Sequence, residues 1–264
     1  MSKKQSRMTK QANAQRAAER AAAMRREQAK KDRRRRTIVV GAVAIGVLAL
    51  IVGIFAFVQS TRDSAGDEPG QVAGAPNGAV DEYAVSLDAD GATGAGAVTV
   101  EVYEDFLCPV CGQFESDAGD TLREYAESDD VQVNYRPISF LDRASNGTEY
   151  STRSMNAVGV VLDESGPEVA LKMHDGLFAN QPAENTDGLS DEELIALAVE
   201  AGADRAAVAQ PIEDVKFEQW VDDATAASQN EGVGGTPTVV VNGEKLEDNS
   251  VESLTAAVES AQQE

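Results

Sequence analysis

Both cysteines of the chain lie in one short stretch, Tyr103-Glu104-Asp105-Phe106-Leu107-Cys108-Pro109-Val110-Cys111. From 97 to 103, the residues leading into the cysteines alternate between Val and more polar side chains, with the two-residue period of a β-strand. The residues that follow, from about 111 to 126, place apolar side chains at helical spacing. The Cys-x-x-Cys pair is therefore predicted to lie where a strand passes into a helix.

This position gives the two sulfur atoms different chemistry. The thiolate, rather than the thiol, attacks a disulfide. Unpaired backbone N–H groups and the helix dipole favour an anion at the start of a helix, so we expect a lowered pKa for Cys108. Cys111 lies one turn further on and is expected to resolve the mixed disulfide that Cys108 forms. Pro109 and Val110 are the spacer, and Pro109 costs little because a first-turn N–H has no helical partner.

The cysteine pair also admits two other interpretations, a structural zinc site and an inert structural disulfide. A structural zinc site needs four ligands, but the chain offers two cysteines and one histidine, His174, which falls in a region of helical pattern. We therefore predict no metal site, no organic cofactor, and a surface or packing role for His174. An inert structural disulfide would close so short a loop that it would add little stability.

A second motif lies near the C-terminal end. Gly235-Thr236-Pro237 comes directly before a β-branched run from 238 to 241, and Asn242-Gly243 follows as a hairpin signal. Ser250 is predicted to cap a last helix. Taken alone, Pro237 also fits an ordinary trans proline that opens an edge strand.

Together the two motifs resemble the thioredoxin superfamily, and more closely its DsbA-like branch, over about residues 80–264. The resemblance implies an α/β fold, with a thioredoxin-like central sheet flanked by helices and an all-helical insert at about 141–231. It also implies a cis Thr236–Pro237 bond beside the dithiol. Thr236 and Pro237 would then present an extended substrate through exposed backbone.

The sequence departs from this family in two places. Many members carry a buried acid six residues before the first cysteine, where this chain has Val102. Glu101 and Glu104 lie nearby, but the strand period predicts that they face opposite sides, so the proton acceptor for Cys111 is unassigned. Asp105 matches a common family acid three residues before the first cysteine. The motif contains no histidine, so a strongly oxidising potential does not follow.

The remaining patterns complete the predicted domain. Residues 80–87 are predicted to form a first strand, and Val131, Val133 and Tyr135 alternate in another that Pro137 ends. Within the insert, Ser190 and Glu193 fit a capping box. Apolar spacing predicts that three aromatic side chains lie in the core. They are Phe178, Phe217 and Trp220.

The N-terminal part predicts a membrane anchor. Residues 37–58 carry no charge, and as a helix they would extend about 33 Å, enough to cross a bilayer. A cleaved signal peptide has a shorter apolar region and a small-residue cleavage site, so an uncleaved transmembrane helix is predicted. Residues 1–36 carry 14 Lys and Arg against 3 Asp and Glu, which predicts a basic cytoplasmic tail. Residues 59–79 are predicted to form a flexible linker.

Residues 80–264 are then expected outside the cytoplasm, at the cell membrane, as the catalytic domain. The chain beyond residue 36 carries 9 Lys and Arg against 42 Asp and Glu, which argues against nucleic-acid binding because phosphates would be repelled. The basic cluster at 33–36 is read as a topology signal.

The sequence as a whole predicts an extracytoplasmic thiol–disulfide oxidoreductase that acts on protein or peptide substrates through Cys108 and Cys111. The direction of electron flow, as oxidase or as reductase or isomerase, is not assigned. The resemblance implies a membrane redox partner of the DsbB or vitamin K epoxide reductase type. The alternative is a membrane-tethered binding or chaperone-like module in which the dithiol is incidental.

Overall fold

The computed structural model describes residues 74–87, 97–128 and 130–263, all within one unit, Ala65–Glu264. The predicted tail at 1–36, the predicted transmembrane helix at 37–58 and the linker up to residue 73 lie outside the described residues. Among the residues that are described, no helix combines the length and the apolar character needed to cross a membrane.

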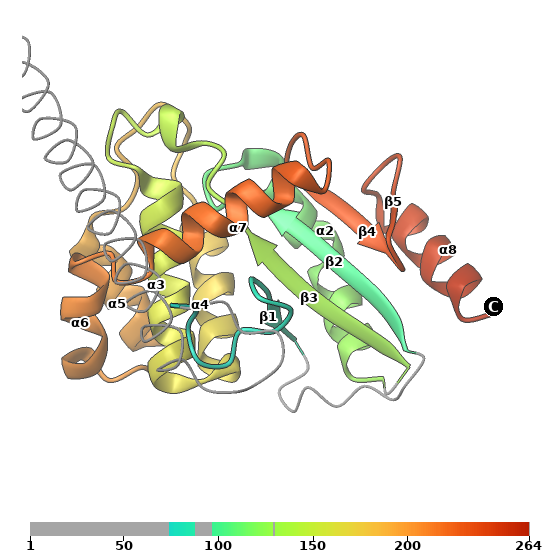
Figure 1. Ribbon diagram of the computed structural model, residues 1–264, viewed down its shortest axis with the longest axis horizontal. Coiled ribbons are helices and arrows are strands. Elements are labelled where there is room, and N and C mark those ends of the chain that lie inside the picture. The colour runs from blue at the N-terminus through green and yellow to red at the C-terminus, as the bar shows by residue number, and fades with distance from the viewer. Residues whose placement is uncertain (1–73, 88–96, 129, 264) are drawn as a thin grey trace, which may run out of the picture. The chain divides into compact units, whose positions relative to one another are not determined.

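The unit is built on a mixed five-stranded sheet in the order β1-β3-β2-β4-β5 (Figure 1). The strands are β1 (Val85–Ser86), β2 (Val98–Glu104), β3 (Val131–Pro137), β4 (Thr238–Val241) and β5 (Glu244–Lys245). Central β2 runs parallel to β3 and antiparallel to β4, so the motif at the end of β2 lies beside the start of β4. The sheet thus brings together two motifs that are about 130 residues apart in the sequence.

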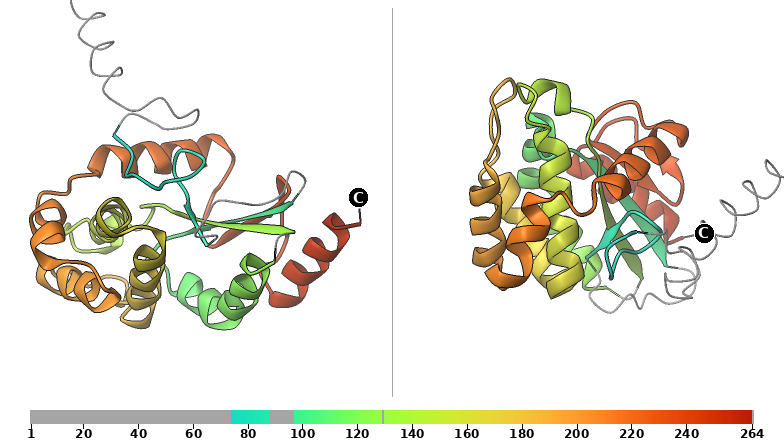
Figure 2. Two further views of the ribbon diagram at one scale, coloured as in Figure 1. Left: turned by 90° about the horizontal axis from the view of Figure 1, so that it is seen from below. Right: turned by 60° about the vertical axis from the view of Figure 1, so that its left-hand side comes forward.

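Two helices cover one face of the sheet, α2 (Pro109–Ala126) and α8 (Val251–Ala261), and both lie below the strands in the left view of Figure 2. The strand period explains this layer, because Val98, Val100 and Val102 all point into it and are buried. Phe114 and Leu122 of α2 pack against them in the same core. The predicted strand, helix and apolar stripe around the cysteines are therefore confirmed.

The predicted insert at about 141–231 is helical in the structure and forms a block beside the sheet (Figure 1). It begins with the short 3₁₀ helix η1 (Asp142–Ala144). Five α-helices follow: α3 (Tyr150–Ser165), α4 (Pro167–Ala179), α5 (Asp191–Ala201), α6 (Arg205–Glu213) and α7 (Glu218–Asn230). Phe217 and Trp220 are buried in its own apolar core, as predicted, and Phe178 packs against that core while partly buried.

Local signals placed several helix ends correctly. Ser190 and Glu193 form both halves of the capping box of α5. Ser250 accepts a hydrogen bond from the backbone N–H of Ser253 as the cap of α8.

The predicted strand at 80–87 is wrong in its length, because only Val85 and Ser86 pair with β3. The residues before them turn sharply, since Asp81 and Glu82 both have positive φ angles, of 43° and 70°. A left-handed backbone cannot continue a strand, so an apolar alternation that looked like eight residues yields two.

Candidate redox site

The loop between β2 and α2 is shaped by the buried carboxylate of Asp105. Its Oδ1 accepts hydrogen bonds from the backbone N–H of Leu107 at 2.8 Å and from the hydroxyl of Ser151 at 2.7 Å. Its Oδ2 accepts from the backbone N–H of Leu141 at 2.9 Å. Burial raises the pKa of Asp105 to about 6, although these hydrogen bonds oppose the rise. The acid that the sequence matched to a family position thus holds the loop in place.

Cys108 is the N-cap residue of α2, and Pro109 occupies the first turn as predicted. The Cys108 carbonyl accepts from the backbone N–H groups of Cys111 and Gly112, at 3.0 and 3.2 Å, so the helix starts at the motif. Both cysteines are free thiols. Cys108 thus stands at the N-terminal end of α2, where unpaired first-turn N–H groups and the helix dipole favour a thiolate.

The second motif meets this sulfur directly. The thiol of Cys108 donates to the backbone carbonyl of Thr236 across 3.3 Å. The Thr236–Pro237 peptide bond is cis, which confirms the expectation drawn from the sequence. Thr238, the next residue but one, opens β4 and pairs with Tyr103 of β2. The sheet register thus fixes Thr236 beside Cys108.

The two thiols differ sharply in acidity. The pKa of Cys108 is lowered to about 6, chiefly by the hydrogen bond from the Cys111 thiol. The backbone N–H groups of Val110 and Cys111 lower this pKa further, whereas burial opposes the shift. Burial raises the pKa of Cys111 well above its usual value, and the hydrogen bond and negative charge of Cys108 and the charge of Glu104 raise it further. Cys108 is therefore the sulfur that ionises first.

The two cysteines also differ in their exposure. A groove of about 600 Å³ is lined by the motif residues 108–110, the segment 139–141 and the loop 233–236. Of the two sulfur-bearing residues, only Cys108 lines this groove, and Cys111 is fully buried. Val110 is 63% exposed, unusual for an apolar residue, and stands at the same opening. Arg143 and Glu184 add charge to the groove wall.

Sequence reasoning missed Gln181, which follows α4 and closes the back of the motif. Its side-chain amide donates to the backbone carbonyl of Phe106 at 3.1 Å and to that of Cys108 at 2.9 Å. No local periodicity marks such a contact, because it joins residues 73 positions apart.

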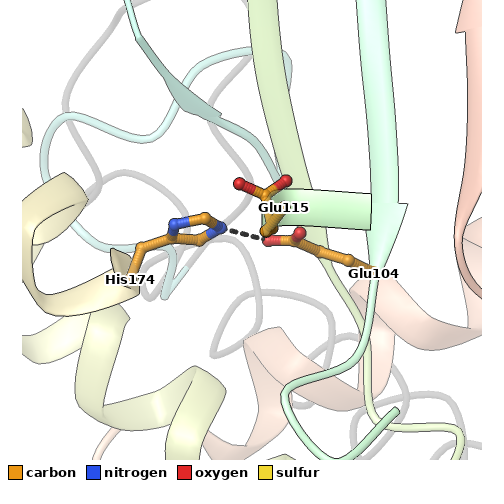
Figure 3. Close-up of side chains that lie close together, drawn as sticks. All are labelled: Glu104, Glu115 and His174. Atoms are coloured by element: carbon orange, nitrogen blue, oxygen red, sulfur yellow. Dashed lines mark hydrogen bonds and ion pairs between the residues drawn. The ribbon is translucent and has the colours of Figure 1, made fainter. Parts of the chain in front are cut away.

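It also missed the buried cluster of Glu104, Glu115 and His174 (Figure 3). Glu104 is fully buried, and its Oε1 lies 2.6 Å from Nε2 of His174. Burial alone would lower the pKa of His174, but the charge of Glu104 raises it to about 10. Burial and the charge of Glu104 raise the pKa of Glu115 to about 7. His174 is 2% exposed, so of the two predicted positions the core is correct and the surface is wrong.

The two-residue period of the strand could have predicted that the side chain of Glu104 is buried. Glu104 stands two residues after Val102, so both side chains point to the same face of β2. Glu101 points to the other face, where its Oε1 forms an ion pair with Arg136 at 2.6 Å. The buried carboxylate near the dithiol is therefore that of Glu104, which is two positions nearer to Cys108 in the sequence than the family's acidic position, occupied here by Val102.

Comparison with known proteins agrees with this geometry. A family profile described as Thioredoxin matches residues 91–260. The chain belongs to the thioredoxin family. It is similar to the solved structure of the reduced disulfide bond oxidoreductase DsbG from Mycobacterium tuberculosis, with 31% identity and a TM-score of 0.57 over 69% of this chain and 88% of that one. The reduced DsbA of the same organism is 30% identical, with a TM-score of 0.54 over 68% and 98% of the two chains. The domain is thus of the DsbA and DsbG type of thiol–disulfide oxidoreductase.

The chain also matches a curated protein of different architecture. The serine/threonine-protein kinase PknE of Mycobacterium tuberculosis is 29% identical over 113 residues, which are 42% of this chain. The matched part spans only a fifth of the kinase's own length, 20%, so the two proteins share a segment rather than a whole architecture.

We predict that alkylation of the reduced protein will be controlled by a group with a pKa of about 6. The rate with iodoacetamide should rise with pH through that value and level off above it, because only the Cys108 thiolate reacts. Replacing Cys111 with Ala removes the largest cause of the shift and should move the midpoint upward. Cys111→Ser keeps a donor and should move it less. A wild-type midpoint near 9 would contradict the prediction.

Proposed function

We propose that the chain is an extracytoplasmic thiol–disulfide oxidoreductase that exchanges disulfides with protein or peptide substrates through the Cys108-Pro109-Val110-Cys111 dithiol. One observation carries the proposal: the sulfur with the lowered pKa lines a groove beside the backbone of Thr236, while its partner is fully buried. This division suits an attacking and a resolving cysteine. The similarity to DsbG and DsbA supports the same reaction class.

The exchange proceeds in two steps whose atoms and electrons balance. The Cys108 thiolate attacks one sulfur of a substrate disulfide, forming a mixed disulfide and releasing the other substrate sulfur as a thiolate that takes up a proton. Cys111 then loses its proton and attacks Cys108, which releases the second substrate thiol. The substrate gains two electrons and the motif becomes a disulfide. The reverse sequence oxidises a substrate dithiol and leaves both cysteines reduced.

The electrostatics give these steps an order. The charge of the Cys108 thiolate and its hydrogen bond with Cys111 both raise the pKa of Cys111. Both causes disappear once Cys108 is part of a mixed disulfide, because its sulfur is then neutral. Cys111 is therefore easier to ionise after substrate has been captured than before.

Thr236 and the groove are proposed to hold the substrate. The Thr236 carbonyl lies 3.3 Å from Sγ of Cys108, so a peptide that pairs with the backbone at Thr236 would bring its own sulfur next to Cys108. The groove of about 600 Å³ offers apolar walls at Pro109, Val110 and Phe140. We therefore expect extended, partly unfolded peptide segments rather than small disulfides as substrates.

We predict that Cys108→Ser abolishes exchange, because the variant lacks the attacking sulfur. Cys111→Ser should instead accumulate mixed disulfides with substrate proteins, since the resolving sulfur is gone. Both outcomes are checked in the full-length protein by non-reducing electrophoresis and by a peptide-disulfide reduction assay. Full complementation of a deletion strain by Cys108→Ser would favour the binding or chaperone-like module instead.

We predict a reduction potential between those of thioredoxin and of a strong oxidant. A low pKa of the attacking cysteine stabilises the reduced form. The value of about 6 for Cys108 falls between about 7 in thioredoxin and about 3.5 in DsbA. The potential should therefore lie between about −270 mV and about −120 mV, measured by equilibration with glutathione. A potential outside this range, below that of thioredoxin or above that of DsbA, would contradict the prediction.

We propose a location at the cell membrane, as a single-pass protein with a cytoplasmic N-terminus. The basic residues 1–36 and the uncharged run 37–58 support it. A membrane redox partner of the DsbB or vitamin K epoxide reductase type would then recycle the dithiol.

We predict that alkaline phosphatase fused after residue 264 is active in intact cells, because that enzyme folds only outside the cytoplasm. An inactive fusion, with a fluorescent cytoplasmic reporter at the same position, would overturn the topology.

A further inference from the structure

We propose that Glu104, Glu115 and His174 form a binding site for a divalent transition-metal ion of the zinc type. The three residues come from β2, α2 and α4, and each offers one ligand atom to a common centre (Figure 3). These ligand atoms lie within 4.8 Å of one another. Ligands of a tetrahedral zinc ion, bound at about 2.0–2.2 Å, stand roughly 3.4 Å apart, so small side-chain shifts would close the site.

Two carboxylate oxygens in the cluster lack a hydrogen-bond partner. They are Oε2 of Glu104 and Oε1 of Glu115, both buried. Glu104 is 0% exposed, so bulk water does not replace the missing partner. An unpaired buried oxygen of a charged group is costly, and a cation bound between the two side chains would remove that cost.

The charges in and around the cluster also favour a cation. Two carboxylates face a single imidazole, so even a protonated His174 offsets only one of them. Arg123 is the basic side chain that faces Glu115, but its Nη2 is bound to Asp175 at 2.8 Å and it is 44% exposed. A divalent ion with a neutral His174 would balance both glutamates.

Each of two ligands is oriented by a neighbour. Nδ1 of His174 lies 3.3 Å from Oδ1 of Asp175, so an N–H at Nδ1 leaves the lone pair of Nε2 facing the cluster. The hydroxyl of Tyr135 donates to Oε2 of Glu115 at 3.0 Å. Histidine ligands of metal ions commonly donate their other N–H to a carboxylate in this way. Phe106, Phe178 and Tyr135 surround the imidazole ring and fix its plane.

An ion could reach the cluster without crossing the redox groove. A separate groove of about 390 Å³ is lined by Glu115 and Asp175, together with Gly112 and Phe178. The shortage of zinc ligands at the dithiol does not apply here, because the cluster uses neither cysteine. One imidazole and two carboxylates suit zinc or similar ions better than calcium or magnesium, which prefer oxygen ligands alone. Three protein ligands leave a fourth position for water.

The test is a calorimetric titration of the full-length protein with Zn²⁺, with the dithiol oxidised so that neither sulfur can bind metal. We expect one ion per chain at neutral pH. Glu115→Gln removes a ligand while keeping an acceptor for Tyr135, and should weaken binding at least tenfold. Asp175→Asn, at a half-exposed position, should weaken it roughly 10- to 100-fold through the orientation of His174.

Glu124→Gln provides the matched control, since it removes one exposed negative charge from the same helix, and its affinity should equal that of the wild type. The proposal is overturned if the oxidised wild type shows no saturable zinc binding, or if Glu115→Gln binds zinc as tightly as Glu124→Gln. In either case the cluster is a buried ion pair alone. The measurement requires no turnover, so its failure would leave the proposed redox function standing.

Discussion

The hydrogen bonds of one buried carboxylate hold together the three segments that surround the attacking sulfur. Asp105 accepts from Leu107 in its own loop, from Leu141 after β3 and from Ser151 in α3. Each of these donors comes from a different part of the chain, so the carboxylate sets the distance between sheet and helical block at the motif. Asp105 is 0% exposed, so removing one of these donors would leave a buried carboxylate oxygen without its hydrogen-bond partner, which is costly.

The loop that Asp105 holds in place leads into two cysteines whose pKa values are shifted in opposite directions. The helix start directs N–H groups toward Cys108, and the cis proline segment keeps that sulfur at the groove. One turn later the chain has entered the core, and Cys111 lies against buried side chains near the negative charge of Glu104. The contrast arises over three residues of separation at a strand-to-helix junction, where the backbone N–H groups of Val110 and Cys111 help to lower the pKa of Cys108.

The sequence was informative where the chemistry is local. The alternation before Cys108 and the apolar stripe after it predicted the central strand and the first helix that the structure contains. The cis Thr236–Pro237 bond was expected only from the resemblance to the DsbA-like branch. It was uninformative where residues distant in sequence meet. His174 reaches Glu104 across 70 positions, and no periodic pattern carries that contact. Glu104 was within reach of the strand period, but its partner was not, so the cluster became visible only in three dimensions.

The two bonds donated by Gln181 have a consequence for how the domain can be rearranged. One amide group supplies both N–H donors to the carbonyls of Phe106 and Cys108, so the helical block completes the backbone hydrogen bonding of the catalytic turn. A chimera that exchanged residues 141–231 for a foreign segment would remove the Gln181 donor from the Phe106 carbonyl, whereas the Cys108 carbonyl would keep its bonds from the N–H groups of Cys111 and Gly112. A graft of the motif loop alone would therefore lose a donor that the insert supplies to the Phe106 carbonyl.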